Sequence, residues 1–189
     1  VSGQNANNSV RLNAAFMQAL EHGDMWELKR RTDGQVSKTI RANDLWQEIA
    51  YNAWACADPG LQFDTTINDW HTCPKSGAIR ASNPCSEFMF LDDSACNLAS
   101  INLVHFLEDD GHFDIDRYEA AVRLFTVALD ITVTMAQYPS PKIAQQSFDF
   151  RPLGLGFANL GSLFMRSGLP YDSPEARALA SAISSITTA

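Results

Sequence analysis

The chain has 189 residues, enough for one domain with a sizeable hydrophobic core. Its 22 acidic and 14 basic residues give a formal net charge of −8, which argues against a general binding surface for nucleic acid or an anionic membrane. No apolar run reaches the roughly 18 to 20 residues of a membrane-spanning helix, and no basic and apolar leader opens the sequence. We therefore expect a soluble, cytoplasmic protein that binds neither nucleic acid nor membranes.

The N-terminal region predicts an amphipathic helix from about Val10 to Glu21, because apolar residues recur there at helical spacing. Asn8 or Ser9 would cap this helix with a side-chain oxygen, and Gly23 would end it.

A β-hairpin is predicted next. Two segments of alternating apolar and polar residues, 26–30 and 36–40, flank the turn dipeptide Asp33-Gly34. A second helix with a broad apolar face would start at the capping residue Asn43, and Asp58-Pro59-Gly60 would then turn the chain.

The middle of the chain combines an irregular path with a strand and a long helix. Leu61 to Pro84 is rich in turn-forming residues and predicts only short extended pieces. The apolar run from Leu98 to Phe106, just after Cys96, predicts a buried strand. A long helix beginning at Asp116 is apolar nearly all round, so we expect it to be buried.

Prolines and caps mark the last helices. Pro139 and Pro141 would end the long helix. Another helix is expected from about Gly156 to Arg166, and Asp172 or Ser173 would cap a final one.

Gly154-Leu155-Gly156 allows two interpretations. The glycines could contact a nucleotide phosphate, but the dinucleotide fingerprint needs a further spaced glycine directly after a strand. Close helix packing is the more common use of such glycines.

The cysteines do not form a recognisable framework. Cys56, Cys73, Cys85 and Cys96 contain no Cys-x-x-Cys pair and lack the density of a disulfide-rich secreted domain. A zinc site from His71 and the last three of these cysteines is conceivable, although structural zinc usually takes closely spaced ligand pairs. We expect Cys56 to be a small buried residue.

The string Asn83-Pro84-Cys85-Ser86-Glu87 places an amide, a thiol and a carboxylate at alternate positions, and Cys96 follows closely. In an extended loop, alternate side chains point the same way, so Asn83, Cys85 and Glu87 would face one pocket. Taken singly, these residues would more often be a turn residue, a small buried residue and a solvated carboxylate. Their joint spacing favours a reaction centre.

This pattern resembles the finger loop of the ribonucleotide reductase large (catalytic) chain. Asn-Pro-Cys is the form found in the adenosylcobalamin-dependent class II enzymes, whereas iron-dependent class I chains usually carry leucine where Pro84 stands. The string Cys96-Asn97-Leu98-Ala99-Ser100 also occurs in class I. Ser86 departs from the glycine common in class II, which reduces the backbone freedom of the loop. The resemblance spans the whole chain and includes three further segments, 4–10, 58–68 and 151–156.

The resemblance implies an α/β fold in which the chain forms part of a ten-stranded barrel with a central finger loop. Residues 1–189 would be a single partial barrel domain, with the finger loop at about 83–95. Because the catalytic chains of this family are several times longer, we expect an internal fragment that is inactive alone.

The resemblance also implies site roles. Cys85 would carry a transient thiyl radical, Glu87 would act as general base, and Asn83 would orient the substrate and the base. Cys96 would be a redox-active thiol whose partner cysteine lies outside this sequence. The resemblance assigns no metal ligand here and leaves the cobalamin-binding residues unknown.

The implied activity is reduction of ribonucleoside di- or triphosphates to deoxyribonucleotides with adenosylcobalamin. The implied partners of the parent are nucleotide effectors, a thioredoxin-like reductant and a second copy of the chain. Two alternatives stay open at this point: a class I fragment that needs a separate radical-generating subunit, and a non-catalytic zinc or binding module.

Overall fold

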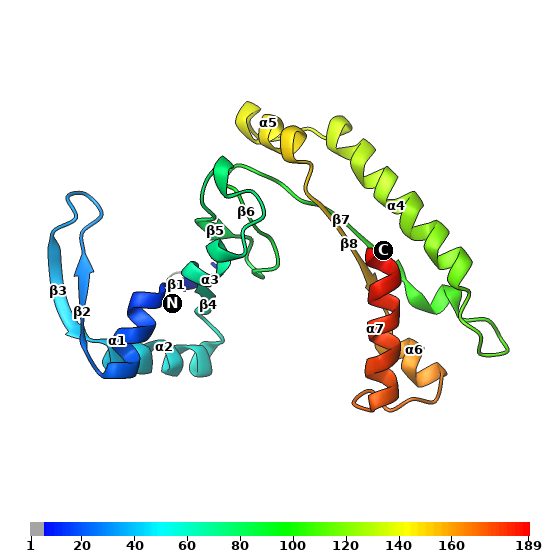
Figure 1. Cartoon of the computed structure of the whole chain (residues 1–189), viewed down its shortest axis with the longest axis horizontal. Coiled ribbons are helices and arrows are strands. Elements are labelled where there is room, and N and C mark those ends of the chain that lie inside the picture. The colour runs from blue at the N-terminus through cyan, green and yellow to red at the C-terminus, as the bar shows by residue number, and fades with distance from the viewer. Residues whose placement is uncertain (1–5) are drawn as a thin grey trace. The chain divides into compact units, whose positions relative to one another are not determined.

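The computed structural model describes residues 6–189 (Figure 1). Gln4 and Asn5, which open the segment 4–10, lie outside the described residues. The chain divides into two compact units, one ending at Asp92 and the other beginning at Asp93. Within residues 6–189 the strands form four two-stranded sheets, which confirms a mixed α/β class. None of these sheets closes, so the ten-stranded barrel and the single partial domain stay predictions.

The first unit is built around a parallel strand pair and an antiparallel hairpin. β1 and β4 run parallel, with Ser9 opposite Gly60 and Leu12 opposite Phe63. Its elements in chain order are β1 (Ser9–Leu12), α1 (Ala14–His22), β2 (Met25–Lys29), β3 (Val36–Arg41), α2 (Ala42–Cys56), β4 (Gly60–Phe63), α3 (Asp64–Asp69), the 3₁₀ helix η1 (Pro74–Ser76), β5 (Ala81–Ser82) and β6 (Met89–Phe90).

Strand β1 occupies part of the predicted first helix. The helix expected from Val10 begins only at Ala14, because the preceding residues pair with the distant strand β4. Asn13 is the capping residue, and its Oδ1 accepts a hydrogen bond from the N–H of Phe16 at 2.9 Å. Gly23 ends α1 in the left-handed conformation, as predicted.

The predicted hairpin is confirmed as β2 and β3. Arg41, rather than Asn43, stands at the N-cap of α2 and makes no side-chain capping bond. The predicted irregular path from 61 to 84 contains β4, α3 and η1, so it is more regular than expected. A small core holds the unit together and consists of Leu12, Phe16, Ala42 and Ile49.

The second unit places helices around a parallel strand pair. β7 and β8 run parallel from Asn97 opposite Leu153 to Asn102 opposite Ala158. Its elements in chain order are β7 (Asn97–Asn102), the 3₁₀ helix η2 (Leu103–Phe106), α4 (Ile115–Met135), α5 (Pro141–Phe150), β8 (Leu153–Ala158), α6 (Leu160–Arg166) and α7 (Pro174–Thr188).

Two boundaries in this unit differ from prediction. The strand after Cys96 ends at Asn102, whose Oδ1 accepts from the N–H of Val104 at 3.2 Å and caps η2. The helix expected from Gly156 is strand β8 up to Ala158, because this segment pairs with β7. By contrast, the final helix is capped by Ser173 as predicted.

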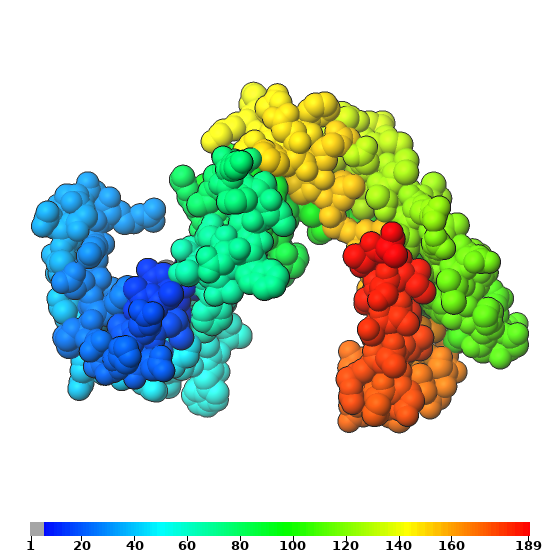
Figure 2. Space-filling model, in the orientation of Figure 1, coloured from blue at the N-terminus to red at the C-terminus, as the bar shows by residue number. Residues whose placement is uncertain are grey.

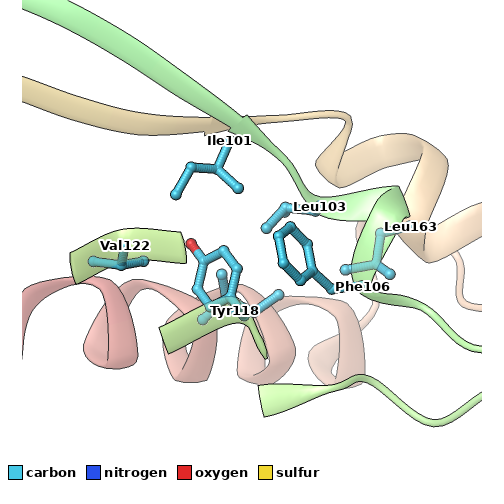
Figure 3. Packing of buried hydrophobic residues seen from close by; sticks show 7 residues of the cluster. Ile101, Leu103, Phe106, Tyr118, Val122 and Leu163 are labelled. Atoms are coloured by element: carbon cyan, nitrogen blue, oxygen red, sulfur yellow. The ribbon is translucent and has the colours of Figure 1, made fainter. Parts of the chain in front are cut away.

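The core of the second unit lies between α4, η2, α6 and α7 (Figure 3). Leu103 and Tyr118 are fully buried, and the rings of Phe106 and Tyr118 meet edge to face with centroids 5.2 Å apart. Tyr118 Oη also pairs with Thr187 Oγ1 at 2.7 Å. This core fixes the end of β7, which Leu103 follows directly.

Helix α4 is only partly buried, contrary to prediction. Val122 and Leu129 are buried on the side that faces β7 and β8. On another side, Leu124 is 68% exposed and Met135 is 75% exposed. Helix α4 lies along the surface of the second unit (Figure 2). The two strands of this unit cover one side of a helix that is apolar nearly all round.

Candidate functional site

The predicted site residues of the first unit lie on the loop of a short hairpin. β5 and β6 are antiparallel, with Ala81 opposite Phe90 and Ser82 opposite Met89. Residues 83–88 connect them and contain the predicted amide, thiol and carboxylate. We call residues 83–88 the Cys85 loop.

The Cys85 loop is a turn, so the predicted extended conformation is wrong. The N–H of Ser86 donates to the backbone oxygen of Asn83 at 3.0 Å. Pro84 occupies the second position of this turn, where its fixed φ is favourable. Ser86 has φ of 66°, in the left-handed region that favours glycine.

Asn83 closes the loop from inside. Its side-chain Oδ1 accepts a hydrogen bond from the N–H of Phe88 at 3.0 Å and another from Ser82 Oγ at 3.2 Å. Asn83 is half-buried. The oxygen of its amide is therefore committed to the loop, and the amide nitrogen is the end that can donate to a ligand.

Cys85 and Glu87 are both exposed and flank Ser86. The structure thus brings a thiol and a carboxylate onto one turn, accessible from solvent. Asn83, Cys85 and Glu87 share this loop through turn geometry, without the strand alternation that the sequence suggested.

A polar network behind the loop was missed by sequence reasoning. Gln62 is 5% exposed, and its Nε2 donates to Ser86 Oγ at 3.1 Å. Arg11 Nη1 donates to Gln62 Oε1 at 3.0 Å. Gln62 lies in the segment 58–68 that carries the resemblance, but only the fold shows which residue it contacts.

Two hollows of the first unit adjoin the loop. One, of about 510 Å³, is mainly apolar, and its lining includes Leu61, Phe63, Trp70, His71, Ser86 and Met89. The other, of about 300 Å³, is more polar, and its lining includes Ser9, Arg11, Arg80, Ser82, Asn83 and Pro84. A ligand with polar groups could therefore approach the loop on the side of Asn83.

Cys96 belongs to the second unit, where it precedes β7 and is half-buried. A Cβ placed on Gly154 would stand 3.2 Å from Cys96 Sγ and 2.5 Å from Leu98 Cδ2. Gly154 lies in β8, so neither helix packing nor a dinucleotide fingerprint explains it. The missing side chain instead leaves room for Cys96 and Leu98.

An ion pair fixes the chain before β8. Arg151 Nε donates to Asp130 Oδ1 at 2.5 Å, and Arg151 Nη2 donates to Asp130 O at 2.7 Å. The hydrogen bond from Arg151 lowers the pKa of Asp130 below its usual value. Arg151 stands at the C-cap of α5 with φ of 47°.

Within residues 6–189, none of the four cysteines forms a disulfide. Cys56 is exposed, contrary to prediction, and its Sγ donates to Asn52 O at 3.2 Å at the end of α2. Within residues 6–189, no three His, Cys, Asp or Glu side chains are grouped so as to hold a metal ion. Nor does any helix of the described chain have the length and apolar character to cross a membrane.

Comparison with known proteins decides the family. The family model described as "Ribonucleotide reductase, barrel domain" matches residues 1–189. The chain belongs to the ribonucleotide reductase barrel-domain family. The predicted site residues of this barrel-domain sequence lie in the Cys85 loop and at Cys96.

Several relatives carry the name "Vitamin B12-dependent ribonucleotide reductase". One from Agrobacterium fabrum is 58% identical over 189 residues, covering 100% of this chain and 15% of the relative. One from Bradyrhizobium diazoefficiens is 59% identical with the same coverage. One from Streptomyces clavuligerus is 51% identical over 192 aligned residues, covering 100% of this chain and 20% of the relative. The chain thus spans 15% to 20% of the length of these ribonucleotide reductases.

Proposed function

We propose that this barrel-domain chain is the finger-loop part of an adenosylcobalamin-dependent ribonucleotide reductase, which converts ribonucleotides to deoxyribonucleotides. The observation that carries the proposal is the 58% identity to a vitamin B12-dependent relative over all 189 residues, together with the exposed thiol and carboxylate of the Cys85 loop. Because the chain spans 15% of that relative, the activity is proposed for the complete parent protein.

The thiol of Cys85 suits the first step. Bound adenosylcobalamin would supply an organic radical that removes a hydrogen atom from this thiol. Cys85 would then take the 3′ hydrogen atom from the ribose. Its exposed place on a turn anchored by Pro84 makes the sulfur reachable for both partners.

Glu87 would accept the proton of the 3′-hydroxyl, because a carboxylate within hydrogen-bond reach is a competent general base. Asn83 would donate from its amide nitrogen to the substrate or to this carboxylate, since its oxygen is already bound to Phe88 and Ser82. The two residues together would orient and activate the sugar without a metal ion in the loop.

Cys96 would take part in the reducing step. The 2′-hydroxyl leaves as water after protonation, and Cys96 together with a second thiol outside this chain supplies two electrons and two protons. These two thiols end as a disulfide, which a thioredoxin-like reductant of the parent would reduce again. The substrate is a ribonucleoside di- or triphosphate, and nucleotide effectors and a second copy of the parent complete the proposed partners.

Cofactor dependence tests the proposal. The complete parent protein is assayed anaerobically with a ribonucleotide and a dithiol, with and without adenosylcobalamin. Deoxyribonucleotide formation that requires adenosylcobalamin is expected. Turnover that requires a separate metal-containing subunit would instead assign the chain to class I.

Glu87→Gln tests the general base in the same assay. We expect kcat to fall roughly 10²- to 10⁴-fold, because the amide cannot accept the hydroxyl proton. Glu48→Gln, at an exposed position of α2, is the matched control and should keep the parental rate. Equal rates for the two variants would remove Glu87 from the mechanism.

A further inference from the structure

Gln62 is a buried polar side chain that connects two strands to the Cys85 loop. It lies on β4 opposite Arg11 of β1, its register partner. At 5% exposure, its amide has little access to water, so both ends of the amide need protein partners. Those partners are Arg11 on one side and Ser86 on the other.

The direction of the Gln62 amide is set by Arg11. A guanidinium only donates, so the Gln62 oxygen must face Arg11 and the Gln62 nitrogen must face Ser86. Arg11 is itself held in place, because its Nη2 donates to Asp64 Oδ1 at 2.6 Å and to Ile79 O at 2.9 Å. Ser86 Oγ is therefore the acceptor of an oriented donor.

Ser86 needs such a partner. It is a residue with a Cβ at φ of 66°, a conformation that L residues other than glycine adopt at a cost. It also stands between Cys85 and Glu87, so its φ sets the direction in which the chain carries these two side chains. A hydrogen bond that favours this conformation therefore acts on both of them.

We propose that Gln62 is a positioning residue for Cys85 and Glu87, which holds Ser86 in the left-handed conformation through the hydrogen bond to Ser86 Oγ. The inference rests on the function proposed above for these two residues. Gln62 acts on the loop through Ser86, and Arg11 acts one step further back by orienting the Gln62 amide.

Four variants of the complete parent protein isolate this role. Gln62→Leu removes the donor at similar size, and Ser86→Ala removes the acceptor while keeping the Cβ. Ser86→Gly removes the acceptor and also the conformational cost. The double variant Gln62→Leu/Ser86→Gly tests whether Gln62 still affects turnover once the conformational cost at position 86 is removed. Gln145→Leu, at an exposed position of α5, is the control for the loss of a glutamine amide.

Turnover should depend on how well each variant keeps the left-handed backbone conformation at position 86. We expect Gln62→Leu and Ser86→Ala each to lower kcat roughly 10- to 100-fold, because small misplacements of reacting groups have effects of this size. KM for the ribonucleotide should change less than kcat. Ser86→Gly should be the milder change at this position, and adding Gln62→Leu to it should cost little more. A role in packing alone predicts the opposite, namely the same loss from Gln62→Leu in both backgrounds.

The alkylation rate of the Cys85 thiol reports the conformation of the Cys85 loop independently of ribonucleotide reduction. The rate for Cys85 is measured by mass spectrometry relative to Cys56, which is exposed on α2. The ratio should change in Gln62→Leu and Ser86→Ala and stay near the parental value in Ser86→Gly.

If the ratio follows this pattern while Cys85 proves dispensable for turnover, the positioning stands and the proposed function fails. If turnover needs Cys85 but neither the ratio nor kcat responds to Gln62→Leu and Ser86→Ala, the positioning role is overturned. Ser86 lies on a loop, so its variants keep the test valid if Gln62→Leu does not fold.

Discussion

Cys85 lies on an exposed turn of the first unit, whereas Cys96 is half-buried at the start of strand β7 in the second unit. Two side chains hold the turn: Asn83 accepts a hydrogen bond from the N–H of Phe88, and Gln62 donates one to Ser86 Oγ. Strand pairing and a glycine on the neighbouring strand make the place for Cys96. The comparison shows two ways to place a thiol: one leaves it exposed on a hydrogen-bonded turn, and the other half-buries it next to a packed strand pair.

The largest effect on stability should come from breaking the core of the second unit, at the opposite end of β7 from Cys96. Leu103 is fully buried directly after β7, and Leu103→Ala should lower the free energy of unfolding of the second unit by about 3 kcal/mol. Urea unfolding followed by alkylation of Cys96 measures this. Leu124→Ala, at a 68% exposed position of α4, should change stability by less than about 0.5 kcal/mol. Similar losses for both variants would contradict the assigned core.

Two glycines of β8 offer a sharper test of the place of Cys96. Gly154→Ala should destabilise by about 1 to 2 kcal/mol, because the new methyl group meets Leu98 and the Cys96 sulfur. Gly156→Ala should be neutral or stabilising by about 0.5 kcal/mol, because its Cβ would enter open space. Thermal unfolding and Cys96 alkylation compare the two. A greater loss from Gly156→Ala would refute the explanation.

Variants of Asn83 test how the Cys85 turn is held. Asn83→Ala removes the acceptor of the Phe88 N–H and should cost about 1 kcal/mol in loop stability, with a changed alkylation rate at Cys85. Asn83→Asp keeps an acceptor but loses the amide donor, so it should preserve the Cys85 alkylation rate and still lower turnover of the parent. If both variants change the alkylation rate equally, the acceptor does not hold the loop.

The smallest effect concerns the stability of the second unit at acidic pH. The pKa of Asp130 is lowered by its hydrogen bond from Arg151, so the pair contributes stability above the unfolded-state pKa of about 4. That contribution is lost as the pH falls through the lowered folded-state pKa. Asp130→Asn should therefore make stability less dependent on pH below about 4. Unfolding curves across this range check the sign, and an unchanged pH dependence would count against it.

Local signals in the sequence predicted local structure well. Asp33-Gly34 marks the confirmed hairpin, Gly23 ends α1, and Ser173 caps α7. Strands β1 and β8 were missed because each is defined by a parallel partner far away in the chain. Helical spacing near Val10 and the glycines near Gly156 gave no sign of that partner.

In the candidate site, too, the local motif could be predicted from the sequence, whereas the features that depend on distant residues could not. The motif around Cys85 and Glu87 was visible in consecutive residues, and the family assignment agrees with the resemblance on which their roles rest. The loop conformation could not be predicted, since the left-handed Ser86 is supported by Gln62, 24 positions away. Likewise, the reason for Gly154 appears only once β8 lies beside β7.

The most direct measurement compares Cys85→Ser with Cys56→Ser in the complete parent protein. Both residues are exposed cysteines, so the two changes are chemically identical and differ in place alone. Deoxyribonucleotide formation is followed anaerobically with adenosylcobalamin and a dithiol. The proposed function predicts that Cys85→Ser reduces turnover to background while Cys56→Ser retains the parental rate. A Cys85→Ser protein as active as the Cys56→Ser protein would contradict it.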